Sequence, residues 1–85
     1  MHLEIITPEK ILYTHEVKLV KVPGAMGSFE ILNNHAPIIS SLDKGTIKII
    51  DADAQTLYYS ITGGVVECKA NKIVVLAHSG EQLNS

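Results

Sequence analysis

His35 is the residue of this 85-residue chain that comes closest to a catalytic group. A catalytic histidine needs a nucleophile or a carboxylate to orient it, and the carboxylates that could serve are Glu30 and Asp43. The alternative is that His35 closes a turn before Ala36-Pro37 or lies at an interface. The sequence favours this alternative, because the stretch 24–37 around His35 contains no other obvious catalytic group.

The other polar residues give little support for metal or phosphate chemistry. Asp51 and Asp53 suggest a calcium loop, but such a loop needs more oxygen ligands, so we expect a solvated hairpin there. The segment from Gly24 to Gly27 lacks the Lys-Ser/Thr pair of a phosphate-binding loop. Cys68 is the single cysteine and is expected to be a small packed side chain. No cofactor and no metal are therefore expected.

Length and composition indicate one small domain covering residues 1–85. The net charge is −2 and all seven basic residues are lysines, so nucleic-acid binding is not expected, because it usually needs a basic face and often arginine. The longest apolar run, 73–77, is far shorter than the ~20 residues that cross a bilayer. Direct insertion into a membrane is therefore not expected.

The elements that must position these residues are short strands separated by turns. No segment has an apolar stripe at helical spacing. Strand-like runs recur at the ~8–12-residue spacing typical of sandwiches and barrels. The runs are 2–6, 10–13, 16–22, 28–32, 37–42, 46–50, 55–62, 65–69 and 73–77. We predict an all-β fold in which two antiparallel sheets pack face to face, with a polar tail, 80–85, too short for a helix.

Three of these segments carry more detailed expectations. The alternation in 16–22 slips at Val20, which a β-bulge or burial on both faces would explain. The run 37–42 is apolar enough to be buried. Asp43-Lys44-Gly45 is typical of a tight hairpin turn, because glycine supplies the positive φ that such turns need.

Two pairs of adjacent residues carry structural expectations of their own. Tyr58 and Tyr59 must point to opposite faces of a strand, so one of them is expected in the core. Gly63-Gly64 indicates a backbone kink or a close contact within a sheet.

Several segments match, in order, the pattern of one family. Residues 27–38, Gly-Ser-Phe-Glu-Ile-Leu-Asn-Asn-His-Ala-Pro-Ile, resemble a segment Gly-x-x-Gly-Ile-x-x-x-His-Ala-Pro-Leu, and 71–77 resembles Asn-x-Val-x-Val-Leu-Ala. Similar matches occur at 3–9, 44–49 and 61–67. These segments cover nearly the whole chain, and they resemble the epsilon subunit of F-type ATP synthases.

The resemblance implies a flattened antiparallel β-sandwich or barrel of about eight to ten short strands. It also implies a role without chemistry in the rotor of the synthase. The expected partners are the gamma subunit and the ring of c subunits, between which the subunit transmits rotation. The expected location is peripheral, on the cytoplasmic side of the bacterial inner membrane.

By position, the resemblance also assigns the c-ring contact. The assigned residues are Ser28, Phe29, Glu30, Ile31, Asn33, Asn34, His35 and Leu42. The family often has an acidic residue at the place of Ser28 and usually glycine at the place of Glu30. We therefore expect Glu30 to be the charged partner of the ring. The resemblance does not say which residues contact gamma.

The end of the chain bears on whether the chain is expected to bind ATP. Many family members continue into two C-terminal helices that inhibit ATP hydrolysis and in some bind ATP. The sequence stops at Ser85, so ATP binding is not expected, and whether the chain is whole stays open.

The alternative function is a small-ligand β-barrel or a minor enzyme using His35. It predicts an enclosed pocket near His35 and Tyr58 or Tyr59.

Overall fold

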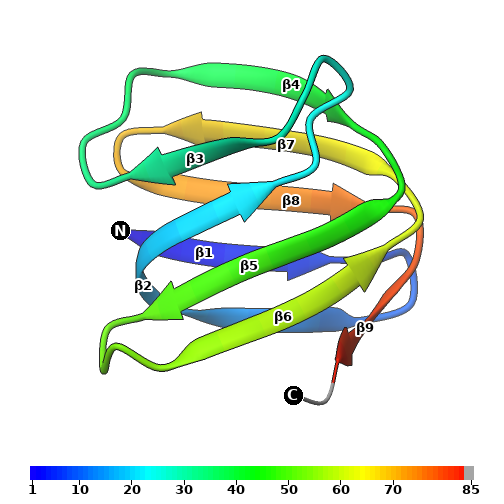
Figure 1. The fold of residues 1–85 in the computed structure, drawn as a ribbon, viewed down its shortest axis with the longest axis horizontal. Coiled ribbons are helices and arrows are strands. Elements are labelled where there is room, and N and C mark those ends of the chain that lie inside the picture. Colours follow the sequence, from blue (N-terminus) through cyan, green and yellow to red (C-terminus); the bar gives the residue numbers. More distant parts are fainter. Residues whose placement is uncertain (84–85) are drawn as a thin grey trace.

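The computed structural model describes residues 1–83, which form nine β-strands and no helix (Figure 1). The strands are β1 (His2–Ile6), β2 (Ile11–Val22), β3 (Phe29–Leu32), β4 (Ile38–Leu42), β5 (Gly45–Asp51), β6 (Thr56–Ile61), β7 (Gly64–Lys69), β8 (Lys72–Ala77) and β9 (Gly80–Leu83). The all-β prediction and its number of strands are confirmed.

Two layers of strands face each other, and the long strand β2 belongs to both. The first layer runs β4-β7-β8-β1-β2, and the second runs β2-β5-β6-β9 with β3 also paired to β2. The path ends at β4 and at β9, so the fold is a sandwich and not a closed barrel. One pair departs from the antiparallel prediction, because β1 and β8 are parallel. Parallel neighbours need a long crossover, which the chain through the second layer provides.

Strand β2 is a single strand of 12 residues, where the sequence pattern predicts two separate runs. The residues between those runs, Thr14 and His15, are exposed, but their backbone pairs with Glu4 and Leu3 of β1. Pairing with a neighbouring strand therefore extends β2 through a segment whose side chains give no strand signal.

The predicted irregularity in β2 is a bulge. The register against β5 shifts between Val17 and Leu19, two residues before the phase of the sequence pattern slips. The extra residue, Lys18, is exposed, and the bulge brings both Val17 and Val20 into the core.

Two expectations for the segment 37–45 are wrong. Strand β4 lies at an edge of the first layer, so Ile39 is 72% exposed and the run 37–42 is only partly buried. Asp43-Lys44-Gly45 does not close a hairpin, because β4 pairs with β7 whereas β5 pairs with β2 and β6. The segment instead carries the chain from one layer to the other.

The polar segment 80–83, for which the sequence predicts no element, forms strand β9. Its backbone pairs with β6, in the register Ile61 to Gly80 and Tyr58 to Leu83. The last two residues of the predicted tail, 84–85, lie outside the described residues.

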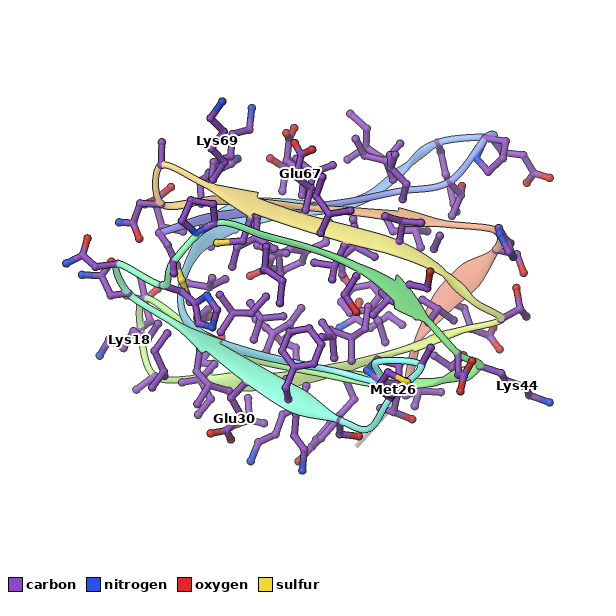
Figure 2. All side chains as sticks on the ribbon, turned by 90° about the horizontal axis from the view of Figure 1, so that it is seen from above. Lys18, Met26, Glu30, Lys44, Glu67 and Lys69 are labelled. Atoms are coloured by element: carbon purple, nitrogen blue, oxygen red, sulfur yellow. The ribbon has the colours of Figure 1, made fainter. Side chains whose placement is uncertain are left out.

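The core fills the space between the two layers with aliphatic side chains (Figure 2). Its largest fully buried members are Leu3, Ile5, Ile31, Ile47, Ile49 and Ile73. Tyr59 is the buried tyrosine of its pair, while Tyr58 is half-buried. Cys68 is buried as predicted, and burial raises the pKa of its thiol.

Tyr13 carries a polar atom that the core does not satisfy. Its hydroxyl is buried and has no hydrogen-bond partner among residues 1–83. Its ring packs edge-on against Tyr59, with the ring centroids 5.7 Å apart. Burial, and after it the charge of Asp51, raises the pKa of Tyr13 above its ordinary value of 10.0.

Replacing Tyr13 with phenylalanine is therefore expected to keep or raise the free energy of unfolding at pH 7, by up to about 1 kcal/mol. Because the unfolded phenol ionises first, the raised pKa makes wild-type stability fall as the pH rises through 10 and above, and Tyr13→Phe should reduce that fall. Urea denaturation across this pH range measures both effects.

Tyr59→Phe is the matched control at pH 7, because the Tyr59 hydroxyl does donate a hydrogen bond, to the Leu12 carbonyl at 3.4 Å. This variant should lose stability. A loss at Tyr13 equal to the loss at Tyr59 would contradict the assignment of an unsatisfied hydroxyl.

Candidate functional site

The residues assigned to the c-ring contact do not form one loop. Ser28 precedes β3 and Asn33-Asn34-His35 follow it, so the two groups lie at opposite ends of β3 (Figure 1). Leu42 lies at the Ser28 end, where it forms an isolated bridge with Gly24. The assigned set therefore makes two separate surfaces, which the outer side of β3 connects.

Alternation along β3 sorts the assigned residues into core and surface. The side chains of Ile31 and Leu42 are buried, and Phe29 packs partly against the core. Glu30 points outward from the second layer (Figure 2), opposite Lys21 in the register with β2. The assigned residues whose side chains reach the surface are Ser28, Glu30, Asn33, Asn34 and His35.

His35 takes the structural role that the sequence favours. Its backbone N–H donates to the Leu32 carbonyl at 3.1 Å, and its Nδ1 donates to the Ala36 carbonyl at 2.7 Å. The carboxylates considered for it lie elsewhere, since Glu30 is on the outer side of β3, and Asp43 follows β4 whereas His35 precedes it. The ring of His35 therefore stabilises its own turn.

The remaining candidates for chemistry are also structural. The β5–β6 hairpin forms as predicted, but Asp51 is buried instead of solvated, and its Oδ1 accepts the N–H groups of Asp53 and Gln55, both at 2.9 Å. Within residues 1–83, no group of three or more His, Cys, Asp or Glu side chains could hold a metal ion. The same residues contain no helix with the length and apolar character to span a membrane.

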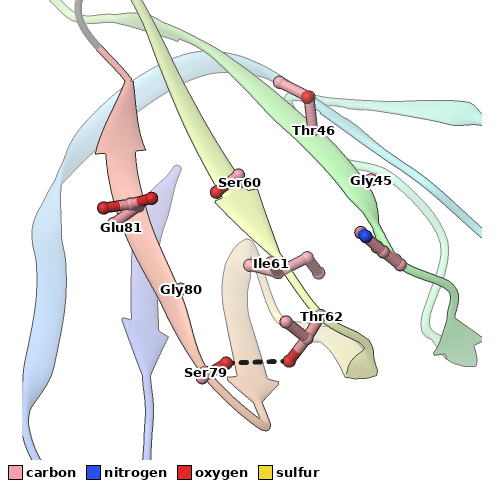
Figure 3. Close-up of a pocket in the computed structure, with 9 residues that line it drawn as sticks. Gly45, Thr46, Ser60, Ile61, Thr62, Ser79, Gly80 and Glu81 are labelled. Carbon is pink, nitrogen blue, oxygen red and sulfur yellow. Dashed lines mark hydrogen bonds between the residues drawn. The ribbon is translucent and has the colours of Figure 1, made fainter.

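An open groove of about 370 Å³ lies along β5, β6 and β9 (Figure 3). Its lining includes Lys44, Thr46, Ser60, Thr62, Ser79 and Glu81. The hydroxyls of Thr62 and Ser79 are 2.9 Å apart and share a hydrogen bond. The groove contains neither His35 nor a tyrosine, so it does not match the enclosed pocket that the alternative function predicts.

The loop between β2 and β3 is held firmly and presents an apolar side chain. Its backbone is tied to the end of β4, because the Ala25 N–H donates to Ser41 at 2.9 Å and the Asp43 N–H donates to Pro23 at 2.8 Å. Met26, at the tip, is fully exposed. Met26 is not among the residues predicted from the sequence, although its place in a glycine-flanked turn is a signal for an exposed side chain.

A further surface feature is a group of apolar side chains on the outer face of the first layer, here called the apolar face. It consists of Ile6, Ile39, Val65, Val74 and Leu76, from strands β1, β4, β7 and β8. Within it, Val65 lies opposite Leu76 in the register, and the two residues line both of its grooves, of about 150 and 480 Å³. Exposed, contiguous apolar side chains of this kind mark interaction sites.

Charged side chains lie within and beside the apolar face. Glu67 is opposite both Ile39 and Val74 in the register and lines the smaller groove with them. Like Lys69, it points outward from the first layer (Figure 2). Lys72 forms an ion pair with Glu4 at 3.4 Å. The apolar face was not predicted from the sequence, although the apolar run 73–77 is a signal for it. An unbroken apolar run places apolar side chains on both sides of its strand. One side packs in the core, so the other side forms an apolar surface unless something covers it.

Comparison with known proteins gives a family match over residues 1–83, to the family described as "ATP synthase, Delta/Epsilon chain, beta-sandwich domain". The ATP synthase epsilon chain of Protochlamydia amoebophila is 41% identical over 81 residues, which are 95% of this chain and 55% of that protein. The epsilon chain of Carboxydothermus hydrogenoformans is 40% identical over 80 residues, covering 94% of this chain and 59% of that protein. The chain thus spans somewhat more than half the length of these relatives.

Solved structures share the fold at lower identity. A chain of the Euglena gracilis mitochondrial ATP synthase, in a structure of its OSCP, F1 and c-ring, superposes with a TM-score of 0.88 at 13% identity. This match covers 94% of the present chain and 51% of the Euglena chain. A chain from the central stalk and c-ring of the Tetrahymena thermophila enzyme gives a TM-score of 0.78 at 21% identity, covering 94% and 64%.

Proposed function

The chain belongs to the ATP synthase delta/epsilon family of β-sandwich domains, and from this premise we propose that it is a central-stalk subunit of an F-type ATP synthase. In this role it couples the c-ring to the gamma subunit for rotary ATP synthesis and does no chemistry of its own. The epsilon-chain names of its relatives support the proposal, as do the stalk and c-ring assemblies that contain its structural neighbours.

The observation that carries the proposal is the apolar face on a filled, two-layered body. Ile39 and Leu76 are more than half exposed on this face, which favours a surface that a partner covers. A close-packed core transmits strain, so the sandwich suits the transfer of torque. We assign the gamma subunit to the apolar face.

For the c-ring we propose the side of the sandwich that carries β3 and its two loops. The surface residues there are Ser28, Glu30, Asn33, Asn34 and His35. Glu30 is the charged residue that would pair with basic groups of the ring, a contact worth about 0–1 kcal/mol on an exposed rim. Through the ring, the subunit would be held at the cytoplasmic side of the bacterial inner membrane without entering the bilayer.

The test is association of the purified chain with the gamma subunit of the same organism, measured by calorimetry. We expect a Kd of about 1 μM or tighter, equivalent to about 8 kcal/mol. Because gamma would bind only the folded chain, it should also raise the melting temperature of the chain. ATP turnover by the chain alone, or no association with folded gamma, would count against the proposal.

A further inference from the structure

We propose that Asn71 is a positioning residue that fixes the β3–β4 loop in the shape in which it meets its partner. The inference rests on the proposed function, because the loop carries part of the proposed c-ring contact. Asn71 lies in the turn between β7 and β8, next to the β3–β4 loop (Figure 1).

The side-chain amide of Asn71 makes two hydrogen bonds to this loop. Its Nδ2 donates to Oδ1 of Asn33 at 2.8 Å, and its Oδ1 accepts the backbone N–H of Asn34, also at 2.8 Å. The partners are 38 and 37 positions away in the sequence. One side chain therefore joins the β3–β4 loop, which connects the two layers, to a hairpin of the first layer.

The turn itself is well anchored. The carbonyl of Asn71 accepts the N–H of His2 at 3.1 Å, which ties the turn to β1. Ala70 and Asn71 have φ values of 50° and 63°, the left-handed backbone of a two-residue hairpin turn. The loop is thus attached to a rigid part of the sandwich.

Asparagine suits this position for two reasons at once. Glycine, asparagine and aspartate are the residues that most readily adopt positive φ in such a turn. Of these, only asparagine offers both a side-chain donor for Asn33 and an acceptor for the Asn34 N–H. Glycine would keep the turn and lose both bonds, and aspartate would keep the acceptor and lose the donor.

The consequence for binding is preorganisation. Asn34 has a φ of 63°, and the bonds of Asn71 hold it there beside the turn that His35 closes with Leu32. A loop that is already ordered loses less conformational freedom when a partner docks. Asn71 would thereby strengthen a contact that it does not itself make.

The test compares Asn71→Gly and Asn71→Asp with the unsubstituted chain of residues 1–85. By NMR, Asn71→Gly should speed exchange of the Asn34 amide about tenfold, and Asn71→Asp less. Affinity for detergent-solubilised c-ring should fall about five- to tenfold with Asn71→Gly, with gamma affinity and the urea midpoint nearly unchanged. Ala70→Gly is the matched control, because Ala70 shares the turn and makes no side-chain hydrogen bond to the loop. This variant should change neither the exchange of the Asn34 amide nor the affinity for the ring.

The readouts separate the possible failures. Unchanged Asn34 exchange in Asn71→Gly would overturn the inference, and so would faster exchange with unchanged affinity for the ring. If wild type does not bind the ring but Asn34 exchange responds to Asn71, the proposed ring contact fails and the hydrogen bonds stand. A fall in ring affinity accompanied by a clear fall in the urea midpoint would also overturn the inference, because the weaker binding would then reflect loss of the folded chain.

Discussion

Replacing Gly64 with alanine is expected to prevent the chain from folding stably. Gly64 begins β7 and lies between two strands, opposite Leu42 of β4 and Ala77 of β8. A Cβ on Gly64 would lie 2.2 Å from the Leu76 carbonyl oxygen and 2.9 Å from the Ala77 Cα. Both are backbone atoms of β8, so neither can rotate away without moving the strand.

The expected loss is about 4 kcal/mol or more, a magnitude reserved for severe disruptions of packing or backbone. A domain of this length has a total stability of only ~4–13 kcal/mol. Urea denaturation followed by circular dichroism would measure the loss. In the proposed complex the same variant should be recovered in reduced amount, because unfolded chains are degraded.

Gly27→Ala is the matched control for this prediction. Gly27 also has a positive φ, +125° against +155° at Gly64, but apart from its own residue and its chain neighbours no heavy atom lies within 4 Å of the position of its Cβ. The control should lose only the stability that a non-glycine residue loses by adopting this backbone conformation, about 1–3 kcal/mol. Equal losses in the two variants would mean that backbone conformation, and not the close approach of β8, makes glycine necessary at position 64.

Strand positions could be predicted from the sequence wherever one face of a strand is buried. In β5 the alternation places Ile47 and Ile49 in the core and Lys48 toward solvent, as the structure has them. Pairing could not be predicted in the same way. Strand β9 has no alternation of apolar and polar residues. It is a strand because its backbone forms hydrogen bonds with β6.

The contact surfaces were harder to predict than the strands. The family resemblance points to Ser28 and His35 as parts of one segment, but β3 separates them by its own length. The exposure of Ile39 depends on β4 being an edge strand, which local sequence does not encode. Asn71 is recognisable as a turn former, whereas its bonds to a loop 37 positions away follow only from the fold.

Placing an aspartate at Leu76 is expected to abolish tight association with the gamma subunit without unfolding the chain. Leu76 is 55% exposed on the outer side of β8, so an aspartate there stays hydrated in the free chain. The stability change should stay within about 1 kcal/mol, the span of strand preferences. In the proposed complex, however, the carboxylate would be buried against an apolar partner, where an unpaired charge is strongly unfavourable.

We expect affinity to fall by about 100-fold or more, which corresponds to about 2.7 kcal/mol. Leu32→Asp is the matched control, since Leu32 is 51% exposed on β3, on the other layer of the sandwich. It introduces the same charge at nearly the same exposure, and it should leave gamma affinity unchanged. Because the two variants differ in location and hardly in chemistry, a loss at Leu32 with none at Leu76 would move the gamma contact to the second layer. A loss at Leu76 alone would assign it to the apolar face.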